Sequence, residues 1–270
     1  MSRAAVLLLA SALAGACDAR PPRAATGSVG SVAATAPAPP APTTQFPVTW
    51  AAALDLASQG DVPRRLATAT RDSLDAAIWT AQCTPTGACT PVDTVFTSTC
   101  AEFAAARRRQ LAVTTAVDIG FAEAVAVRCA ALDAIAKARP ARQSAVRDVR
   151  LTPALLDSLP AGLGLIVLPE DSERVAAAER AGKTLKGADP ALKGSVETFG
   201  RADTVLRGRS QSQEVLVSVF GRGDFDGDGW DDVLAKVITG AVGGSFTSQQ
   251  LWLLTRRAPG ERLRAVRRLW

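Results

Sequence analysis

Histidine and tyrosine are both absent from the 270-residue sequence. Histidine is the commonest general base and a frequent zinc ligand, so its absence excludes Ser-His-Asp and Cys-His catalysis and disfavours zinc sites. Without tyrosine there is no tyrosine nucleophile. The sequence also lacks a nucleotide-binding glycine motif and a G-x-S-x-G nucleophile elbow. Most enzyme classes are therefore disfavoured, and the catalytic alternative that is left is a hydrolase using only Asp and Glu.

Positive and negative charges are nearly balanced in the sequence. Lys and Arg number 31 against 26 for Asp and Glu, a formal net charge of +5. This mild basic balance is not typical of nucleic-acid binding, so we expect no nucleic-acid partner. The arginine-rich run 256–268 could contact anionic lipid or polysaccharide. The favoured interpretation is an edge strand whose charges oppose sheet-to-sheet association.

Five cysteines are present, and one of them lies close to the N-terminus. The other four are Cys83, Cys89, Cys100 and Cys129, and in an exported protein an even number indicates two disulfides with three possible pairings. An intervening proline and glycine would let Cys83 and Cys89 close a small loop. That leaves Cys100 for Cys129, and the chain between them must then turn back, because one straight helix would hold them about 40 Å apart.

The N-terminal segment has the layout of a bacterial secretory signal. Residues 1–16 contain a basic start at Arg3, an apolar run and small residues before Cys17. The apolar run is too short to span a bilayer. Leu13–Cys17 resembles a lipobox, which implies that Cys17 becomes the lipid-modified first residue of the mature protein. An ordinary cleavage site beside a cysteine is the alternative.

Residues 17–47 are rich in Ala, Pro, Thr, Ser and Gly and contain few large apolar side chains. Such a composition cannot build a core and predicts a disordered tether. Its prolines oppose a helix, and an extended tether of this length would reach up to about 90 Å. Together with Cys17, it predicts an exported cell-envelope protein, periplasmic or surface-facing, held at a membrane by a lipid anchor.

The segment Asp224–Asp232 follows the pattern D-x-D-x-D-G-x-x-D. Four carboxylates within nine residues repel one another unless a cation neutralises them. Ca²⁺ takes six to eight oxygen ligands, and a glycine at Gly229 permits the sharp bend that such a loop needs. The predicted calcium ligands are the carboxylates of Asp224, Asp226, Asp228 and Asp232 and the main-chain carbonyl of Trp230. An exposed acidic turn that binds nothing is the alternative.

The residues Phe220–Leu234 resemble the calcium loop of FG-GAP, or VCBS-like, repeats, which occur in integrin α-chains and many bacterial extracellular proteins. In that family the ion lies between two antiparallel strands, and the ninth position, here Asp232, is the last ligand. An EF-hand does not fit, because its twelfth position carries a bidentate Glu and here it is Ala235. A multi-bladed propeller is disfavoured, because the sequence contains no second such loop and no repeat period.

Apolar periodicity divides the remaining chain into two regions. Region 48–192 is predicted to be mainly helical, with a loop over 83–91 and a short strand over 144–151. Its predicted helices begin at Trp50, which Thr49 would cap, and then cover 61–82, 100–117, 121–138, 153–159 and 172–182. In region 193–270 the period changes to two, which predicts strands over 195–199, 204–207, 213–220, 233–239, 248–256 and 262–270.

These patterns predict an α+β fold in which a helical, disulfide-stapled half packs with an antiparallel sheet. The calcium loop would lie in a hairpin, where a bound ion could order the long connection and set the strand register. We therefore expect a non-catalytic calcium-binding envelope lipoprotein with a structural ion and an unknown protein or polysaccharide ligand. The alternatives are a carboxylate-based envelope hydrolase and an adhesion accessory whose Ca²⁺ bridges to an acidic ligand.

Overall fold

A computed structural model describes residues 45–67, 77–166, 169–199, 203–244 and 247–270. All of these residues belong to one compact unit, Pro42–Trp270. The predicted signal segment, Cys17 and nearly all of the predicted tether lie outside the described residues.

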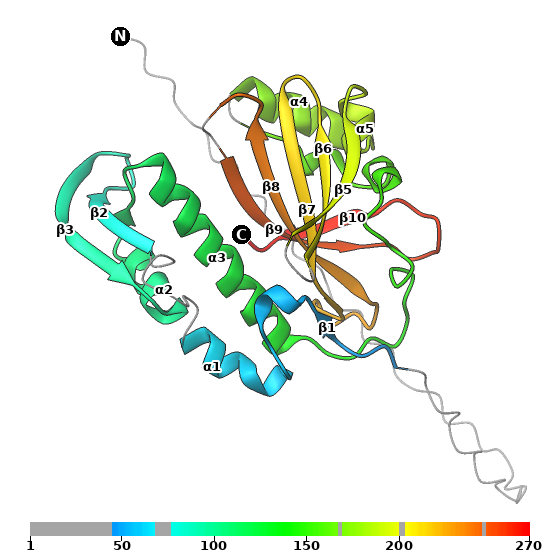
Figure 1. The fold of residues 1–270 in the computed structure, drawn as a ribbon, viewed down its shortest axis with the longest axis horizontal. Coiled ribbons are helices and arrows are strands. Elements are labelled where there is room, and N and C mark those ends of the chain that lie inside the picture. The colour runs from blue at the N-terminus through cyan, green and yellow to red at the C-terminus, as the bar shows by residue number, and fades with distance from the viewer. Residues whose placement is uncertain (1–44, 68–76, 167–168, 200–202, 245–246) are drawn as a thin grey trace, which may run out of the picture. The chain divides into compact units, whose positions relative to one another are not determined.

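The large sheet is antiparallel and has the strand order β10-β9-β8-β7-β6-β5 (Figure 1). A short strand, β1 (Thr49–Trp50), adds to β7 at Arg222 and Gly221. The other strands are β5 (Lys193–Phe199), β6 (Asp203–Arg209), β7 (Gln213–Gly223), β8 (Asp232–Ala241), β9 (Thr247–Thr255) and β10 (Arg264–Arg268). The antiparallel sheet predicted for the C-terminal region is confirmed.

Both faces of this sheet contact a hydrophobic core. Val215, Val217 and Val237 alternate onto one face, as the pleat requires, and pack with two 3₁₀ turns and a short helix. These are η3 (Pro153–Asp157), η4 (Ala161–Leu163) and α5 (Leu185–Ala188), and the helix α4 (Pro169–Arg180) contacts η4. The opposite face packs through Leu234 and Leu251 against α3 (Ala116–Lys137).

A second, three-stranded sheet lies on the far side of α3 (Figure 1). Its order is β3-β2-β4, with β2 (Ala77–Cys83), β3 (Cys89–Thr97) and β4 (Leu111–Ala112). The helix α2 (Cys100–Arg108) packs with it through Phe103, next to Trp79 and Val125. The remaining elements are η1 (Ala52–Leu54), η2 (Gln59–Asp61) and α1 (Val62–Ala67).

The prediction of a helix over 61–82 is wrong at its C-terminal end. The helix α1 covers Val62–Ala67, residues 68–76 lie outside the described chain, and β2 begins at Ala77. Trp79 and Ala81 are buried and alternate with more exposed neighbours, which is the period of a strand. The indole N–H of Trp79 donates to Thr97 across the hairpin at 3.1 Å, so the pairing with β3 sets the structure of this segment.

The predicted helices over 100–117 and 121–138 have different bounds. The first ends at Arg108, and Gln110 takes a left-handed φ of 60° that turns the chain into β4. The second begins at Ala116, because Thr115 accepts a hydrogen bond from the N–H of Asp118 and caps it. The gap between the two predicted helices, residues 118–120, therefore lies inside α3.

Two further assignments differ from the structure. Thr49 does not cap a helix at Trp50, since both residues form β1 and the 3₁₀ turn η1 begins at Ala52. The predicted strand over 144–151 is irregular, because the main-chain carbonyls of Val146 and Val149 accept hydrogen bonds from the guanidinium group of Arg222.

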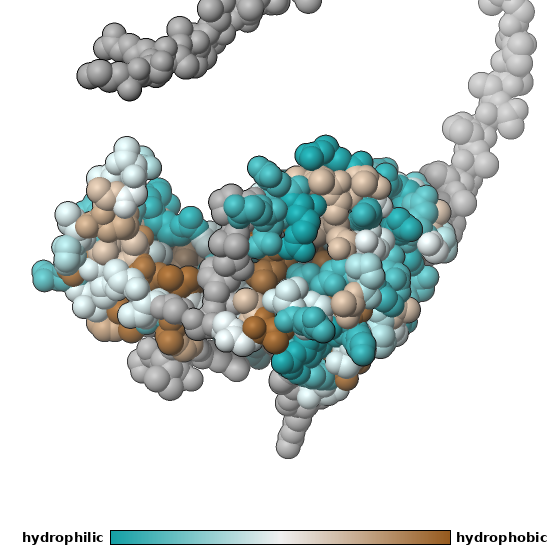
Figure 2. Space-filling model, turned by 90° about the horizontal axis from the view of Figure 1, so that it is seen from above, coloured by the Kyte–Doolittle hydropathy of each residue, from teal (hydrophilic) through white to brown (hydrophobic). Residues whose placement is uncertain are grey.

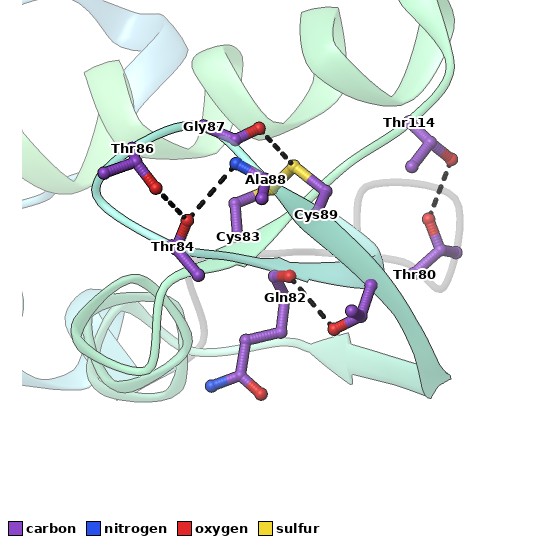
Figure 3. The surroundings of a disulfide bond; sticks show 10 residues. Thr80, Gln82, Cys83, Thr84, Thr86, Gly87, Ala88, Cys89 and Thr114 are labelled. Carbon is purple, nitrogen blue, oxygen red and sulfur yellow. Dashed lines mark hydrogen bonds between the residues drawn. A yellow bond between two sulfur atoms is a disulfide. The ribbon is translucent and has the colours of Figure 1, made fainter.

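Both disulfides have the pairing that the sequence favoured. Cys83 and Cys89 are direct cross-strand partners at the tip of the β2–β3 hairpin, so the predicted loop over 83–91 is a tight turn that leads into β3 (Figure 3). Cys100 at the start of α2 is bonded to Cys129 in α3, and their Cα atoms are 5.6 Å apart. The second bond fastens α2 to the helix that lies between the two sheets.

Candidate metal centre

The acidic segment connects β7 to β8 at one end of the large sheet. Gly227 and Gly229 both have a φ of 86°, a left-handed conformation that side chains with a Cβ rarely adopt. A Cβ on Gly229 would also lie 2.8 Å from a guanidinium nitrogen of Arg142. The glycines therefore allow the turns that bring the aspartates of this loop close together.

Three of the predicted ligands converge. One carboxylate oxygen from each of Asp224, Asp226 and Asp232 lies within 4.8 Å of the other two. Asp224 and Asp232 are 5% and 0% exposed, whereas Asp226 is exposed. This group could hold a metal ion with two ligands enclosed by the protein and one at the surface.

Asp232 has an enclosed oxygen atom without a partner. Its Oδ2 accepts a 3.3 Å hydrogen bond from the N–H of Phe225, but its Oδ1 is buried and accepts none from the described residues. Burial raises the pKa of Asp232 to about 7, the hydroxyl of Thr255 opposes that rise, and the charges of Asp226 and Asp228 add to it. A bound cation would supply positive charge to this buried carboxylate.

Main-chain hydrogen bonds orient the other two converging carboxylates. Asp224 accepts from the N–H groups of Gly227 at 2.7 Å and Gly229 at 3.0 Å, and Asp226 accepts from the N–H of Asp228 at 3.1 Å. Asp224 also exchanges two main-chain hydrogen bonds of 3.0 Å with Arg139, which follows α3. The direction of the side chains is thus set by the loop and by the segment beside it.

Asp228 and Trp230 both contact Arg257. Asp228 forms an ion pair with Arg257 and accepts a 2.8 Å hydrogen bond from the N–H of Trp230. The hydrogen bond from Arg257 lowers the pKa of Asp228, and the same guanidinium group lies 5.1 Å from the centre of the Trp230 ring. Asp228 is outside the converging group, so its ligand role, like that of the Trp230 carbonyl, stays a prediction.

Asp231 is a buried carboxylate to which the sequence assigned no role. It is 0% exposed and pairs with Nε of Arg147 at 2.5 Å, while the hydroxyl of Ser144 donates to it at 2.9 Å. Burial raises its pKa, and these partners oppose that rise. Asp231 therefore faces away from the proposed ion and anchors the loop to the segment that contains Arg147.

Main-chain bonds strengthen this anchor. The carbonyl of Gly229 accepts from the N–H groups of Arg142 at 2.8 Å and Gln143 at 3.1 Å, and the N–H of Asp231 donates to the carbonyl of Gln143 at 2.8 Å. We did not predict that Arg147, Arg257 and the bracing segment, residues 139–147, contact the loop. These residues are distant from the loop along the chain and follow no motif.

A carboxylate-based hydrolase would need two acids in a cleft away from this loop. One cavity of about 550 Å³ between η4, α4 and β10 is lined by Glu179 and Glu261, among other residues. Glu261 already accepts hydrogen bonds from the N–H groups of Arg257 at 3.1 Å and Ala258 at 3.2 Å. One of the two acids therefore caps a turn, and the cavity does not favour the catalytic alternative over the metal centre.

Comparison with known proteins does not identify a relative. No family model, no curated protein and no solved structure matches this chain. Among the described helices, none combines the length and the apolar character needed to cross a membrane.

Proposed function

We propose that Asp224, Asp226 and Asp232 hold a calcium ion. The observation that carries this proposal is the convergence of three carboxylates, two of which are buried, together with a buried Oδ1 of Asp232 that accepts no well-aligned hydrogen bond from the described residues. An all-oxygen donor set suits a hard cation, and flexible coordination by carboxylates, carbonyls and water is typical of Ca²⁺. The resemblance of the loop to FG-GAP repeats agrees with this choice of ion.

The ion would have a structural role. It would neutralise carboxylates that otherwise repel one another, and it would tie the end of β7, through Asp224, to the start of β8, through Asp232. In the described residues Asp231 and the bracing segment 139–147 already hold one side of the loop. Calcium would then fix the other side and stabilise the register of the hairpin.

A calcium titration tests this proposal, because Trp230 lies inside the loop. Its intrinsic fluorescence should change on addition of Ca²⁺ up to the millimolar range typical of extracellular modules, about 10⁻⁴ to 10⁻³ M. Asp226→Asn should weaken this response, because it replaces a charged ligand at an exposed position by a neutral, weaker one, whereas Asp93→Asn in the exposed strand β3 should not. An identical response in Asp226→Asn and the wild-type protein would contradict the assignment.

We further propose that the protein is exported and anchored to the bacterial cell envelope through Cys17. The lipobox-like segment supports this, and the two disulfides are typical of an oxidising compartment. Cys17→Ser should move the protein from the membrane fraction of the producing bacterium to the soluble fraction, while Cys83→Ser should not. Unchanged partitioning of Cys17→Ser would refute the lipid anchor.

The role of the anchored domain would be binding or envelope organisation, without catalysis. Because Asp226 is exposed, an ion at this site would be within reach of solvent, which favours one second candidate: an adhesion accessory whose Ca²⁺ bridges to an acidic ligand. Alginate, an acidic polysaccharide, would then bind in calcium and not in its absence. Equal retention of the protein on alginate with and without calcium would leave the structural role as the better account.

A further inference from the structure

Arg257 brings a positive charge to the acidic loop from another strand. It follows the end of β9, and β9 pairs with the start of β8 through Leu254 and Val233. The guanidinium group of Arg257 donates a hydrogen bond to Oδ2 of Asp228 and forms an ion pair with it. The protein chain therefore supplies a cation of its own to the loop for which we propose a calcium ion.

The charge of Arg257 acts on the converging carboxylates as well as on Asp228. The hydrogen bond to Asp228 raises the pKa of Arg257. Partial burial opposes that rise in pKa, and the charges of Asp228, Asp232 and Asp226 add to it. Asp226 and Asp232 belong to the converging group. Arg257 thus offsets part of the repulsion among the carboxylates of the loop.

Both carboxylate oxygens of Asp228 have partners. Oδ2 accepts from Arg257, and Oδ1 accepts from the N–H of Trp230 at 2.8 Å. The spacing of the motif predicts Asp228 as a ligand, yet it lies outside the converging group. A guanidinium group in contact with this carboxylate would repel a divalent cation beside it. Asp228 can therefore join the ligands only when it separates from Arg257.

The side chain of Arg257 is held loosely enough for this separation. It is 35% exposed and Asp228 is 31% exposed, so water can solvate the guanidinium group once the pair opens. The guanidinium group lies 5.1 Å from the centre of the Trp230 ring, and its Nη1 donates no hydrogen bond to the described residues. The main chain is fixed, because the N–H of Arg257 donates to Glu261 at 3.1 Å. The side chain can therefore leave the loop while the backbone stays in place.

We infer that Arg257 competes with calcium for Asp228 and thereby sets the calcium affinity of the loop, an inference that rests on the proposed calcium site. Without the ion, Arg257 neutralises Asp228. When calcium is present, Asp228 exchanges Arg257 for the ion and becomes a fourth carboxylate ligand. The exchange makes binding weaker than four free carboxylates would allow, which suits the affinity of extracellular modules, about 10⁻⁴ to 10⁻³ M.

Isothermal titration calorimetry of the full chain with calcium chloride tests this inference. Arg257→Met removes the competing charge and should bind calcium about tenfold more tightly than the wild type. If Arg257→Met binds calcium with the affinity of the wild type, the competition is refuted and the calcium site stands. If neither protein binds calcium, the calcium site itself is refuted and the inference falls with it.

Arg209→Met is the matched control, because it makes the same change of charge far from the loop. Arg209 is exposed in β6 and pairs with β7 at Glu214, about 30 Å along that strand from the loop. Figure 2 looks onto the end of the molecule that carries the β6–β7 turn, where many hydrophilic residues are exposed. At physiological ionic strength charges are screened beyond about 8 Å, so Arg209→Met should bind calcium as the wild type does. A tenfold gain in this control as well would refute a specific role of Arg257.

A double-mutant cycle with Asp228→Asn separates the exchange of a ligand from simple repulsion. If Arg257 acts by holding Asp228, then Arg257→Met should change the calcium affinity of the Asp228→Asn protein by less than about threefold. A tenfold gain in both backgrounds would show that Arg257 repels the ion without withholding a ligand, and would overturn the exchange.

Thermal unfolding distinguishes this role from a purely structural one. In calcium-free buffer Arg257→Met should have a lower Tm than the wild type, because the loop loses its internal cation. Calcium at a fixed millimolar concentration should then raise the Tm of Arg257→Met by more than that of the wild type, because tighter binding gives more stabilisation. An equal loss of Tm with and without calcium would contradict the competition.

Discussion

The ion pair between Arg147 and Asp231 should contribute measurably to stability. Arg147→Met leaves Asp231 buried with one hydroxyl donor, since the 2.5 Å contact with Nε is lost. Removal of one partner of a buried pair costs about 3 to 5 kcal/mol. Because the Arg147 side chain is 29% exposed, water screens part of the interaction, and we expect a loss near the lower limit, about 3 kcal/mol.

Other contacts of Arg147 contribute to that loss. Its guanidinium group also donates to the carbonyl of Pro47 at 2.6 Å and lies 5.7 Å from the centre of the Phe46 ring. A double-mutant cycle with Asp231→Leu separates these contacts from the ion pair. The coupling energy between the two positions should be about 2 kcal/mol, and the double variant should be more stable than Arg147→Met alone.

Urea denaturation of the wild type, the two single variants and the double variant in calcium-free buffer provides the four free energies of unfolding. Arg209→Met, at an exposed strand position, is the control and should change stability by less than about 0.5 kcal/mol. A coupling energy near zero, or an Arg147→Met protein as stable as the control, would refute the claim that Asp231 anchors the loop through a buried ion pair.

Two further predictions concern α3. Replacing both Cys100 and Cys129 by Ser opens a cross-link over a sequence separation of 29 and should lower the free energy of unfolding by about 3 to 4 kcal/mol, measured by denaturant titration. Burial raises the pKa of Glu123 although the N–H of Gln249 donates to it at 2.7 Å, so the folded protein retains this proton to higher pH than the unfolded chain. Stability should therefore fall as pH rises above about 4, the usual range of Glu, and Glu123→Gln should reduce that slope.

The strands of the C-terminal region were predictable because their side chains alternate between two different surroundings. Val215 and Val217 face one core, while Leu216 between them is half-buried on the other face. Glycine-bearing turns separate these runs. Such local signals are enough to locate strands, although they do not determine their order in a sheet.

The strand β2 could not be found from local pattern. Ala77, Ile78 and Ala81 fit a helical spacing as well as a strand, and the structure is decided by pairing with β3 on one side and β4 on the other. The disulfide between Cys83 and Cys89 closes that hairpin. Tertiary pairing of this kind overrides weak local propensity.

The candidate site was predictable in part for a similar reason. Asp224, Asp226 and Asp232 follow a spacing that brings oxygens together, so the motif alone indicated them. Arg257 approaches from the end of β9, and its ion pair with Asp228 has no local signal. The spacing of aspartates within one loop shows which carboxylates could bind a metal ion. It cannot show which of them forms an ion pair with a residue from another strand.

Thermal unfolding with and without calcium is the decisive test of a calcium site in the loop Asp224–Asp232. The metal binds to the folded loop, so Ca²⁺ at 100 times its dissociation constant should stabilise the wild-type protein by about 2.7 kcal/mol and raise its Tm. Asp93→Asn should show the same rise, and Asp226→Asn, which lacks one of the three converging carboxylates, should show much less. A Tm that does not respond to millimolar calcium, or that rises equally in Asp226→Asn, would contradict a calcium site in this loop.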